Sequence, residues 1–323
     1  MSALKRATKR AVASPLGWRV VSRILRQPGV TVLTYHRITR PGDLFPGLDL
    51  DRFRAQMTWL RDRCTTIASD ALLDACRRPN RDRPVVLITF DDGYRDYHDN
   101  AYPVLRELGL PAVVFLATSF MDKGGMIWTD QVYWACHASD TKEVRLPWDD
   151  TVRFDLTCVG ERERLAVSCK GYLKDVPDRQ RTQWLDRLLE ALHVRGREHE
   201  VKRQTMTWDE VRSTLTGTEY GGHTHTHPIL SQLDGTSMEE EIRLCRERIE
   251  AETGVTPRTF AYPNGRAVDY NADTKRLLRK HGFVLAFTTV EGINGAAVDP
   301  LEIRRVPTHA GTLGDFACLV SNL

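Results

Sequence analysis

The chain has 323 residues, enough for two ordinary domains or for one large α/β barrel with a sizeable buried core, so small stapled and fibrous classes are excluded. Lys plus Arg number 46 and Asp plus Glu 43, and a formal charge of only +3 argues against nucleic acid as the main partner. The seven cysteines form an odd, widely spaced set without a CxxC pair, which indicates neither a disulfide framework nor a zinc ribbon. A reducing, cytoplasmic compartment fits this usage.

Residues 1–29 are predicted to form a basic helix. Residues 1–26 carry seven basic side chains and no acidic one, and no apolar core of secretory type follows, so we expect no signal peptide. Leu16, Val20 and Ile24 recur at helical spacing. We expect this helix to pack on the main domain, and the alternative is a peripheral contact with an anionic membrane through residues 1–26. No run approaches the ~18 apolar residues that a membrane-spanning helix needs.

Apolar runs typical of buried strands alternate with helical patterns along most of the chain, as in parallel βα units. The predicted strands are Val30–Tyr35, Pro84–Phe90, Ala112–Ala117, Glu219–Gly222, Arg258–Tyr262 and Phe283–Thr288. The predicted helices are Phe53–Arg63, Ala101–Leu108, Arg179–His193, Met238–Thr253 and Ala272–His281. The alternation fades between Ser119 and Met206. We therefore predict an α/β fold: a distorted (β/α) barrel of about seven strands over residues 30–118 and 207–310, with an inserted helical cap at 119–206 that shapes the substrate groove.

Two adjacent carboxylates follow one of the predicted buried strands. Asp91, Asp92 and Gly93 come directly after Phe90, and α/β barrels place catalytic groups at the carboxyl ends of their strands. Two ionised carboxylates in such a place repel each other, so a divalent metal is expected to stabilise them. The alternative is that Asp-Asp-Gly serves only as a turn.

Three of the ten histidines fall within five residues, at His223, His225 and His227. Imidazole is a common ligand of transition metals, and histidines at i and i+4 on a helix can reach one ion. Pro228 argues against a helix here, and in an extended segment all three rings would point the same way. The spacing alone does not decide whether two or three of these histidines bind the metal.

Two further segments are weaker signals. Phe260–Gly265 is a strand that runs into a turn containing Pro and Gly. Leu33–His36 ends a strand with a histidine, which is a candidate acid or base and equally a candidate core residue.

Together these segments resemble the polysaccharide deacetylases, the carbohydrate esterase family 4 or nodulation protein B homology group. The resemblance rests on TFDDG (Thr89–Gly93), HTxxHP (His223–Pro228) and FAYPNG (Phe260–Gly265), and it covers Val30–Pro307. WTDQ (Trp128–Gln131) and AFTTVEGIN (Ala286–Asn294) are similar to the exopolysaccharide branch, which acts on N-acetylated amino sugars.

The resemblance implies a role for each matching residue. Asp91 would be the general base, and the ligands of a divalent metal would be Asp92, His223 and His227. Zinc is the expected metal, and cobalt, nickel and manganese also suit the family. The substrate-binding residues would be Tyr262, Pro263, Asn264 and Arg305, and the backbone N–H of Asn264 would help to stabilise the oxyanion.

Two departures from the family pattern stand out. The arginine that orients the base is replaced by Ala261, and we predict that Arg305, in the run IRRV, takes over its role. The C-terminal LxxH motif is also absent, and Leu33–His36 resembles that motif moved to the N-terminus, as in a circularly permuted branch. Such a move leaves the side chains in place, because the first and last strands of a closed barrel are neighbours. His36 would then be the general acid, and His309 is the alternative candidate.

The predicted activity is metal-dependent hydrolysis of N-acetyl groups from N-acetylglucosamine-type residues of an oligo- or polysaccharide, either free or lipid-linked, in exopolysaccharide biosynthesis. The alternatives are an O-acetyl esterase or a deformylase with the same metal site, and a catalytically silent carbohydrate-binding barrel. A glycoside hydrolase fits poorly, because its two carboxyls lie at least ~5 Å apart on opposite sides of the scissile bond, whereas Asp91 and Asp92 are sequence neighbours.

Overall fold

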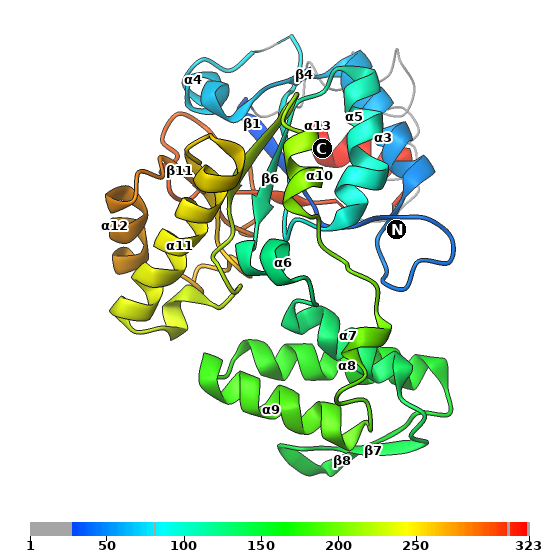
Figure 1. The fold of residues 1–323 in the computed structure, drawn as a ribbon. Coiled ribbons are helices and arrows are strands. Elements are labelled where there is room, and N and C mark those ends of the chain that lie inside the picture. The colour runs from blue at the N-terminus through cyan, green and yellow to red at the C-terminus, as the bar shows by residue number, and fades with distance from the viewer. Residues whose placement is uncertain (1–27, 81, 309–310, 322–323) are drawn as a thin grey trace.

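The computed structural model describes residues 28–80, 82–308 and 311–321 (Figure 1). The predicted basic helix of residues 1–29 lies outside the described residues except for its last two positions, 28 and 29, which are not helical; its expected contacts with the barrel or with a membrane, through residues 1–26, also lie outside them. Within the described ranges, no helix is both long enough and apolar enough to cross a membrane.

A parallel sheet forms the centre of the molecule. Its main path has the order β11-β10-β9-β6-β5-β1-β12, and β4 (Thr65–Thr66) pairs with β5 off this path. The path strands are β1 (Val30–Tyr35), β5 (Val85–Phe90), β6 (Ala112–Leu116), β9 (Thr218–Gly222), β10 (Thr259–Ala261), β11 (Leu285–Phe287) and β12 (Val306–Pro307). Every residue of β1, β5 and β6 is buried, which explains their nearly continuous apolar runs. The predicted barrel of about seven strands is confirmed.

The segment Ile303–Pro307 joins the two edges of this sheet. At one end the Ile303 N–H donates to the Ala286 carbonyl of β11, at 2.9 Å. At the other end Val306 pairs in parallel with Leu33 of β1. The first and last strands are therefore neighbours, and a side chain on this segment reaches the carboxyl end of the barrel near β1 and β5.

The helices pack on the outside of the sheet. They are α3 (Leu50–Arg63), α4 (Leu72–Arg77), α5 (Tyr102–Leu108), α6 (Thr118–Lys123), α10 (Trp208–Ser213), α11 (Gly235–Thr253), α12 (Ala272–Lys280) and α13 (Leu313–Ser321). In Figure 1, α3 and α5 lie on one side of the sheet and α11 and α12 on the other. Helix α11 begins at Gly235, before the predicted Met238, because the Asp234 side chain accepts a hydrogen bond from the Ser237 N–H at 2.8 Å.

Between β6 and β9 the chain builds a separate lobe with its own apolar core (Figure 1). It contains α7 (Trp128–Ala138), β7 (Glu143–Leu146), β8 (Asp149–Asp155), α8 (Val159–Lys174) and α9 (Asp178–Ala191). The antiparallel pair of β7 and β8 is a hairpin that we did not predict from the sequence. The helical character predicted for this region is present in α7, α8 and α9.

A buried arginine ties this lobe to the barrel. Arg37, which follows β1, donates to the Asp130 carboxylate of α7 at 2.7 Å. Its guanidinium lies over the rings of Phe45 and Tyr94, 4.5 and 3.5 Å from their centroids. This contact places α7 beside the carboxyl ends of β1 and β5.

The short parallel pair β2 (Ile38–Thr39) and β3 (Leu48–Asp49) follows β1 directly and leads into α3.

Candidate active site

Asp91 and Asp92 lie where the chain leaves the buried strand β5. The Asp91 N–H donates to the Tyr35 carbonyl at 3.0 Å, which continues the pairing of β5 with β1. Asp92 and Gly93 have φ values of 73° and 69°, in the left-handed region. A Cβ atom on Gly93 would approach the Leu116 side chain to 2.7 Å, so this turn requires glycine. The motif is therefore a turn, and the same turn directs its two carboxylates toward different partners.

The histidine segment is a tight loop after β9. Thr224 and His227 have φ values of 65° and 63°, and the His227 N–H donates to the Thr224 hydroxyl at 3.0 Å. The ring of His225 turns away, and its Nδ1 lies 2.9 Å from the Thr118 hydroxyl. The alternative of an extended segment with all three rings on one side is thus wrong, because the chain twice adopts left-handed backbone geometry. His223 and His227 remain together.

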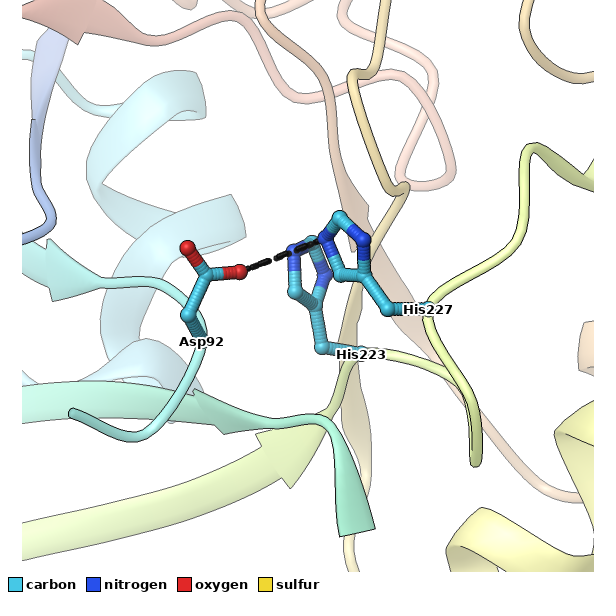
Figure 2. A group of neighbouring side chains, drawn as sticks. All are labelled: Asp92, His223 and His227. Carbon is cyan, nitrogen blue, oxygen red and sulfur yellow. Dashed lines mark hydrogen bonds and ion pairs between the residues drawn. The ribbon is translucent and has the colours of Figure 1, made fainter. Parts of the chain in front are cut away.

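Asp92, His223 and His227 converge on one point (Figure 2). The Asp92 Oδ1 atom lies 3.3 Å from the Nε2 atom of each histidine, and the two Nε2 atoms are 3.2 Å apart. The Nδ1 atom of His223 lies 2.7 Å from the Ala261 carbonyl, to which it donates its proton. This hydrogen bond leaves the Nε2 lone pair of His223 free to bind a cation.

These three residues suit a divalent transition metal. Their side chains are nearly completely buried, and the Asp92 Oδ1 atom has no well-aligned hydrogen bond within the described part of the chain. Burial alone would raise the pKa of Asp92, but the two imidazole rings beside it hold this pKa well below its usual value. One carboxylate and two imidazoles form the donor set of many catalytic zinc sites, which keep further positions open for water and substrate.

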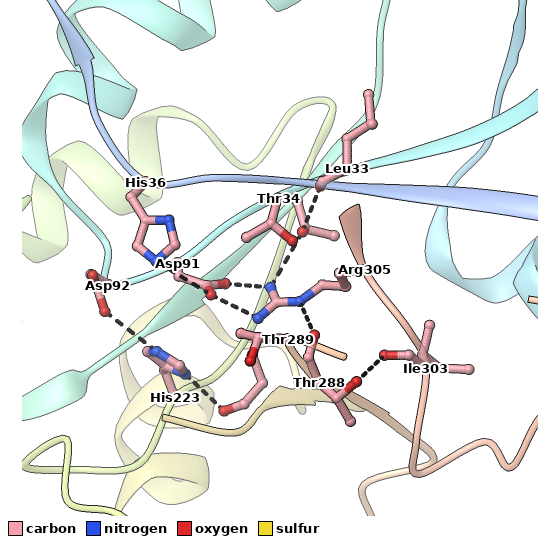
Figure 3. A network of polar contacts seen from close by, with 12 residues as sticks. Leu33, Thr34, His36, Asp91, Asp92, His223, Thr288, Thr289, Ile303 and Arg305 are labelled. Carbon is pink, nitrogen blue, oxygen red and sulfur yellow. Dashed lines mark hydrogen bonds and ion pairs between the residues drawn. The ribbon is translucent and has the colours of Figure 1, made fainter. Parts of the chain in front are cut away.

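Asp91 contacts a buried arginine instead (Figure 3). Two nitrogens of Arg305 donate to the two Asp91 oxygens at 2.6 and 2.8 Å, and Arg305 Nε donates to the Thr288 carbonyl at 2.8 Å. Burial would raise the pKa of Asp91, but Arg305 outweighs this effect and the pKa is lowered. The carboxylate is therefore held ionised in one orientation.

Arg305 thus makes the contact expected of an arginine at position 261. It comes from the segment that joins the two sheet edges, and its side chain is only 1% exposed. The sequence also grouped Arg305 with the substrate-binding residues. Its side chain is buried and does not line the pocket described below, so within the site it contacts Asp91 and not the space open to a substrate.

His36 lies at the carboxyl end of β1, beside Asp91 (Figure 3). Its Nε2 atom is 3.8 Å from the Asp91 Oδ2 atom, and its side chain is 53% exposed. His36 is therefore not a core residue, and its position suits exchange of a proton with a substrate. The rival candidate, His309, lies outside the described residues.

The residues of the FAYPNG segment (Phe260–Gly265) differ in what they can contact. The Tyr262 hydroxyl donates to the Leu301 carbonyl at 2.9 Å, and its ring stacks on Tyr270 with centroids 4.1 Å apart. The Tyr262 ring therefore packs in the core, but Tyr262 also lines the pocket over the site, so its contact with substrate stays a prediction. Pro263 is buried and does not line the pocket. Asn264 does line it, with a φ of 59°.

An open pocket of about 750 Å³ lies over these groups. The barrel contributes His36, Asp91, Asp92, His223, His227 and Asn264 to its lining. The inserted lobe contributes Asp130 and Tyr133 from α7 and Lys170 and Lys174 from α8. None of these four side chains was predicted as part of the site. The WTDQ similarity was a signal for Asp130, but nothing in the sequence indicated which face of α8 meets the barrel.

Comparison with known proteins was made in both sequence and structure. The family model described as polysaccharide deacetylase matches residues 78–150 and 174–286, which together exceed half of the chain. YxkH, a candidate polysaccharide deacetylase of Bacillus subtilis (strain 168), is 37% identical over 89 residues. That match spans 26% of this chain and about 30% of the length of YxkH.

Solved structures share the fold. The Streptococcus pyogenes deacetylase PplD, in complex with acetate, superposes with a TM-score of 0.60 at 17% identity, covering 91% of this chain and 99% of PplD. IcaB from Ammonifex degensii gives a TM-score of 0.58 at 17% identity, covering 92% and 98% of the two chains. Identities this low establish the architecture alone, and the family model supplies the membership. The chain belongs to the polysaccharide deacetylase family.

Proposed function

We propose that this protein hydrolyses N-acetyl groups from N-acetylglucosamine-type residues of an oligo- or polysaccharide, with one divalent metal ion, most suitably zinc. The observation that carries the proposal is that one pocket contains both a metal-ligand set and a separate carboxylate held in place by an arginine. Asp92, His223 and His227 offer a metal-ligand set, and Arg305 holds Asp91 ionised beside it. Nothing in a purely sugar-binding barrel requires both.

Asp91 is suited to act as the general base. Its two oxygens accept hydrogen bonds from Arg305, which lowers its pKa and orients it toward the pocket. A bound metal would polarise the acyl carbonyl and make an attacking water more acidic. Asp91 takes the proton of that water as the water attacks the carbonyl carbon.

His36 and Asn264 complete the proposed mechanism. His36 is exposed to the pocket and close to Asp91, so it is placed to donate a proton to the departing sugar amine. The backbone N–H of Asn264 is the proposed donor to the oxyanion. The products are acetate and a free amino sugar.

The alternative of a catalytically silent carbohydrate-binding barrel was suggested by the missing arginine at Ala261. The contact of Arg305 with Asp91 argues against it, because Asp91 has an arginine partner after all. An O-acetyl esterase or a deformylase would use the same residues, so these alternatives differ in substrate. Action on a cytoplasmic or lipid-linked precursor in exopolysaccharide biosynthesis stays a prediction.

The test is acetate release from a tetramer of N-acetylglucosamine by zinc-loaded protein. The wild type should release acetate, and Asp91→Ala and His223→Ala should not. His225→Ala is the matched control, because that ring contacts Thr118 and not the ligand set. Release of acetate from O-acetylated xylan, or of formate from an N-formyl sugar, with none from the tetramer, would replace the proposed substrate. No release of any acyl group by protein with one bound zinc would overturn the proposal.

A further inference from the structure

Two lysines of the inserted lobe face the pocket that contains Asp91 and His36. Lys170 and Lys174 are four residues apart on α8 and therefore share one face of the helix. Both side chains are half-buried. The Lys170 ammonium lies 5.7 Å from the centre of the Tyr133 ring, which lines the same pocket. The two positive charges thus form part of the wall opposite the barrel.

These lysines lack the carboxylate partners that the arginines of the pocket have. Arg37 is paired with Asp130, and Arg266 with Asp175 and Asp269. Neither Lys170 nor Lys174 forms an ion pair with any residue that the structure describes. Their charges are therefore available to a ligand.

The surroundings of Lys174 disfavour its positive charge. The pKa of Lys174 is lowered, first by burial and then by the nearby charges of Arg266 and Lys170. Asp269 and Asp175 act in the opposite direction but do not compensate. Partial burial of two like charges is unfavourable unless an anion neutralises them.

The lysines also lie at the part of the chain where the family model stops. The match omits residues 151–173, which include Lys170, and it resumes at Lys174. A neutral acetylated sugar offers no charge for these ammonium groups to bind. Their position at the pocket, without an ion-pair partner among the described residues, therefore points to an anionic group on the substrate.

We propose that Lys170 and Lys174 form a subsite for an anionic group of the substrate, a phosphate or carboxylate carried on or next to the N-acylated sugar. This inference rests on the proposed function, since it specifies the substrate of the same pocket. A phosphate would come from a sugar linked to a lipid carrier, and a carboxylate from a uronate unit of the polymer. Both present oxygens that an ammonium binds as a point charge.

The test measures binding separately from turnover. Calorimetry on the zinc-loaded full chain uses three tetrasaccharide probes whose N-acetyl groups are replaced by N-methanesulfonyl groups, which resist hydrolysis. One probe is the neutral glucosamine tetramer, the second bears a phosphate at its reducing end, and the third alternates with glucuronate. At low salt we expect at least one charged probe to bind about tenfold more tightly than the neutral probe, and high salt should remove most of this advantage.

Variants assign the effect to the two lysines. Lys170→Gln with Lys174→Gln should abolish the tighter binding of the charged probe and leave the neutral probe unchanged. Lys142→Gln removes the same charge from an exposed position of the same lobe and should behave as wild type. The double variant Lys170→Arg with Lys174→Arg keeps both charges and should therefore retain the tighter binding of the charged probe. The salt dependence of binding by the wild type gives a readout that needs no variant.

The outcomes separate the two proposals. Preference for the phosphate or the glucuronate probe identifies the source of the anion. Equal binding of all three probes by the wild type, or charged-probe binding that is unchanged in the double variant, would overturn the subsite. Failure of acetate release from the neutral N-acetylated tetramer would count against the proposed function alone, because calorimetry does not depend on catalysis.

Discussion

Replacing Arg305 by methionine tests the structural argument for Asp91. In the wild type, Asp91 is 3% exposed and both its oxygens accept hydrogen bonds from Arg305, at 2.6 and 2.8 Å. Methionine fills a similar volume but leaves the buried carboxylate without a cation. Removing one partner of a buried ion pair costs about 3–5 kcal/mol. We expect a loss of this size in the free energy of unfolding of the metal-free protein near pH 7.

The pH dependence of this loss has a defined sign. The pKa of Asp91 is lowered in the wild type, so its contribution to stability is present above the unfolded-state pKa, about 4, and is lost as the pH falls through the folded-state pKa. In the variant, burial without Arg305 raises this pKa, so the folded state loses stability as the pH rises above about 4. The difference between the two proteins should therefore be larger at pH 7.5 than at pH 5.

The assay is urea unfolding at both pH values, with acetate release measured on the zinc-loaded proteins. We expect Arg305→Met to lower the rate by about 10²–10⁴, the range for loss of a general base, since Asp91 would lose the cation that orients it and favours its ionised form. Arg305→Lys should recover part of the stability, because it restores one charge without the paired hydrogen bonds. Arg304→Met is the matched control, since Arg304 is the exposed neighbour. Equal stability, pH dependence and rate for Arg305→Met and Arg304→Met would refute the reasoning.

Three further predictions concern the metal, the proposed acid and the N-terminal segment. Zinc at 100 times its dissociation constant should stabilise the wild type by about 2.7 kcal/mol in thermal or urea unfolding, and His227→Ala should lose this gain; an equal gain in the variant would contradict the ligand set. His36→Ala should lower kcat by about 10²–10⁴ in acetate release and leave zinc binding intact, whereas unchanged kcat would remove His36 from the mechanism. Deleting residues 1–26 should reduce co-sedimentation with anionic vesicles only if this segment contacts membranes; if the two proteins sediment alike, the contact is excluded.

The sequence identified the central strands because burial on both faces demands nearly continuous apolar runs. The observed β1 has the predicted bounds, and β5 starts only one residue later than predicted. Asp91 and Asp92 could be placed from the same reasoning, because residues that directly follow a buried parallel strand emerge at the functional end of a barrel. The local sequence pattern was sufficient to predict these features, because the burial of each strand is visible in its own run of apolar residues.

The inserted lobe shows where this reasoning fails. Its hairpin of β7 and β8 was not predicted, because its alternation of buried and exposed residues is short and depends on packing against α8 and α9. The face of α8 that carries Lys170 and Lys174 could not be oriented for the same reason. The spacing of apolar residues predicts which side of a helix is buried, but it does not predict which part of the molecule the polar side faces.

What the sequence determined by itself is the chemistry offered at each strand end: a pair of aspartates, a histidine cluster and a lone histidine at His36. The resemblance to the family added the expectations that His223 and His227 are the ligands and that Arg305 orients Asp91, but only the tertiary structure shows the contacts that bring these residues together. Two left-handed residues in the histidine loop separate His225 from the ligand set. A contact across 214 residues pairs Arg305 with Asp91 in place of the arginine absent at Ala261. No local pattern encodes such a contact, because it exists only once the segment around Ile303 has joined the two edges of the sheet.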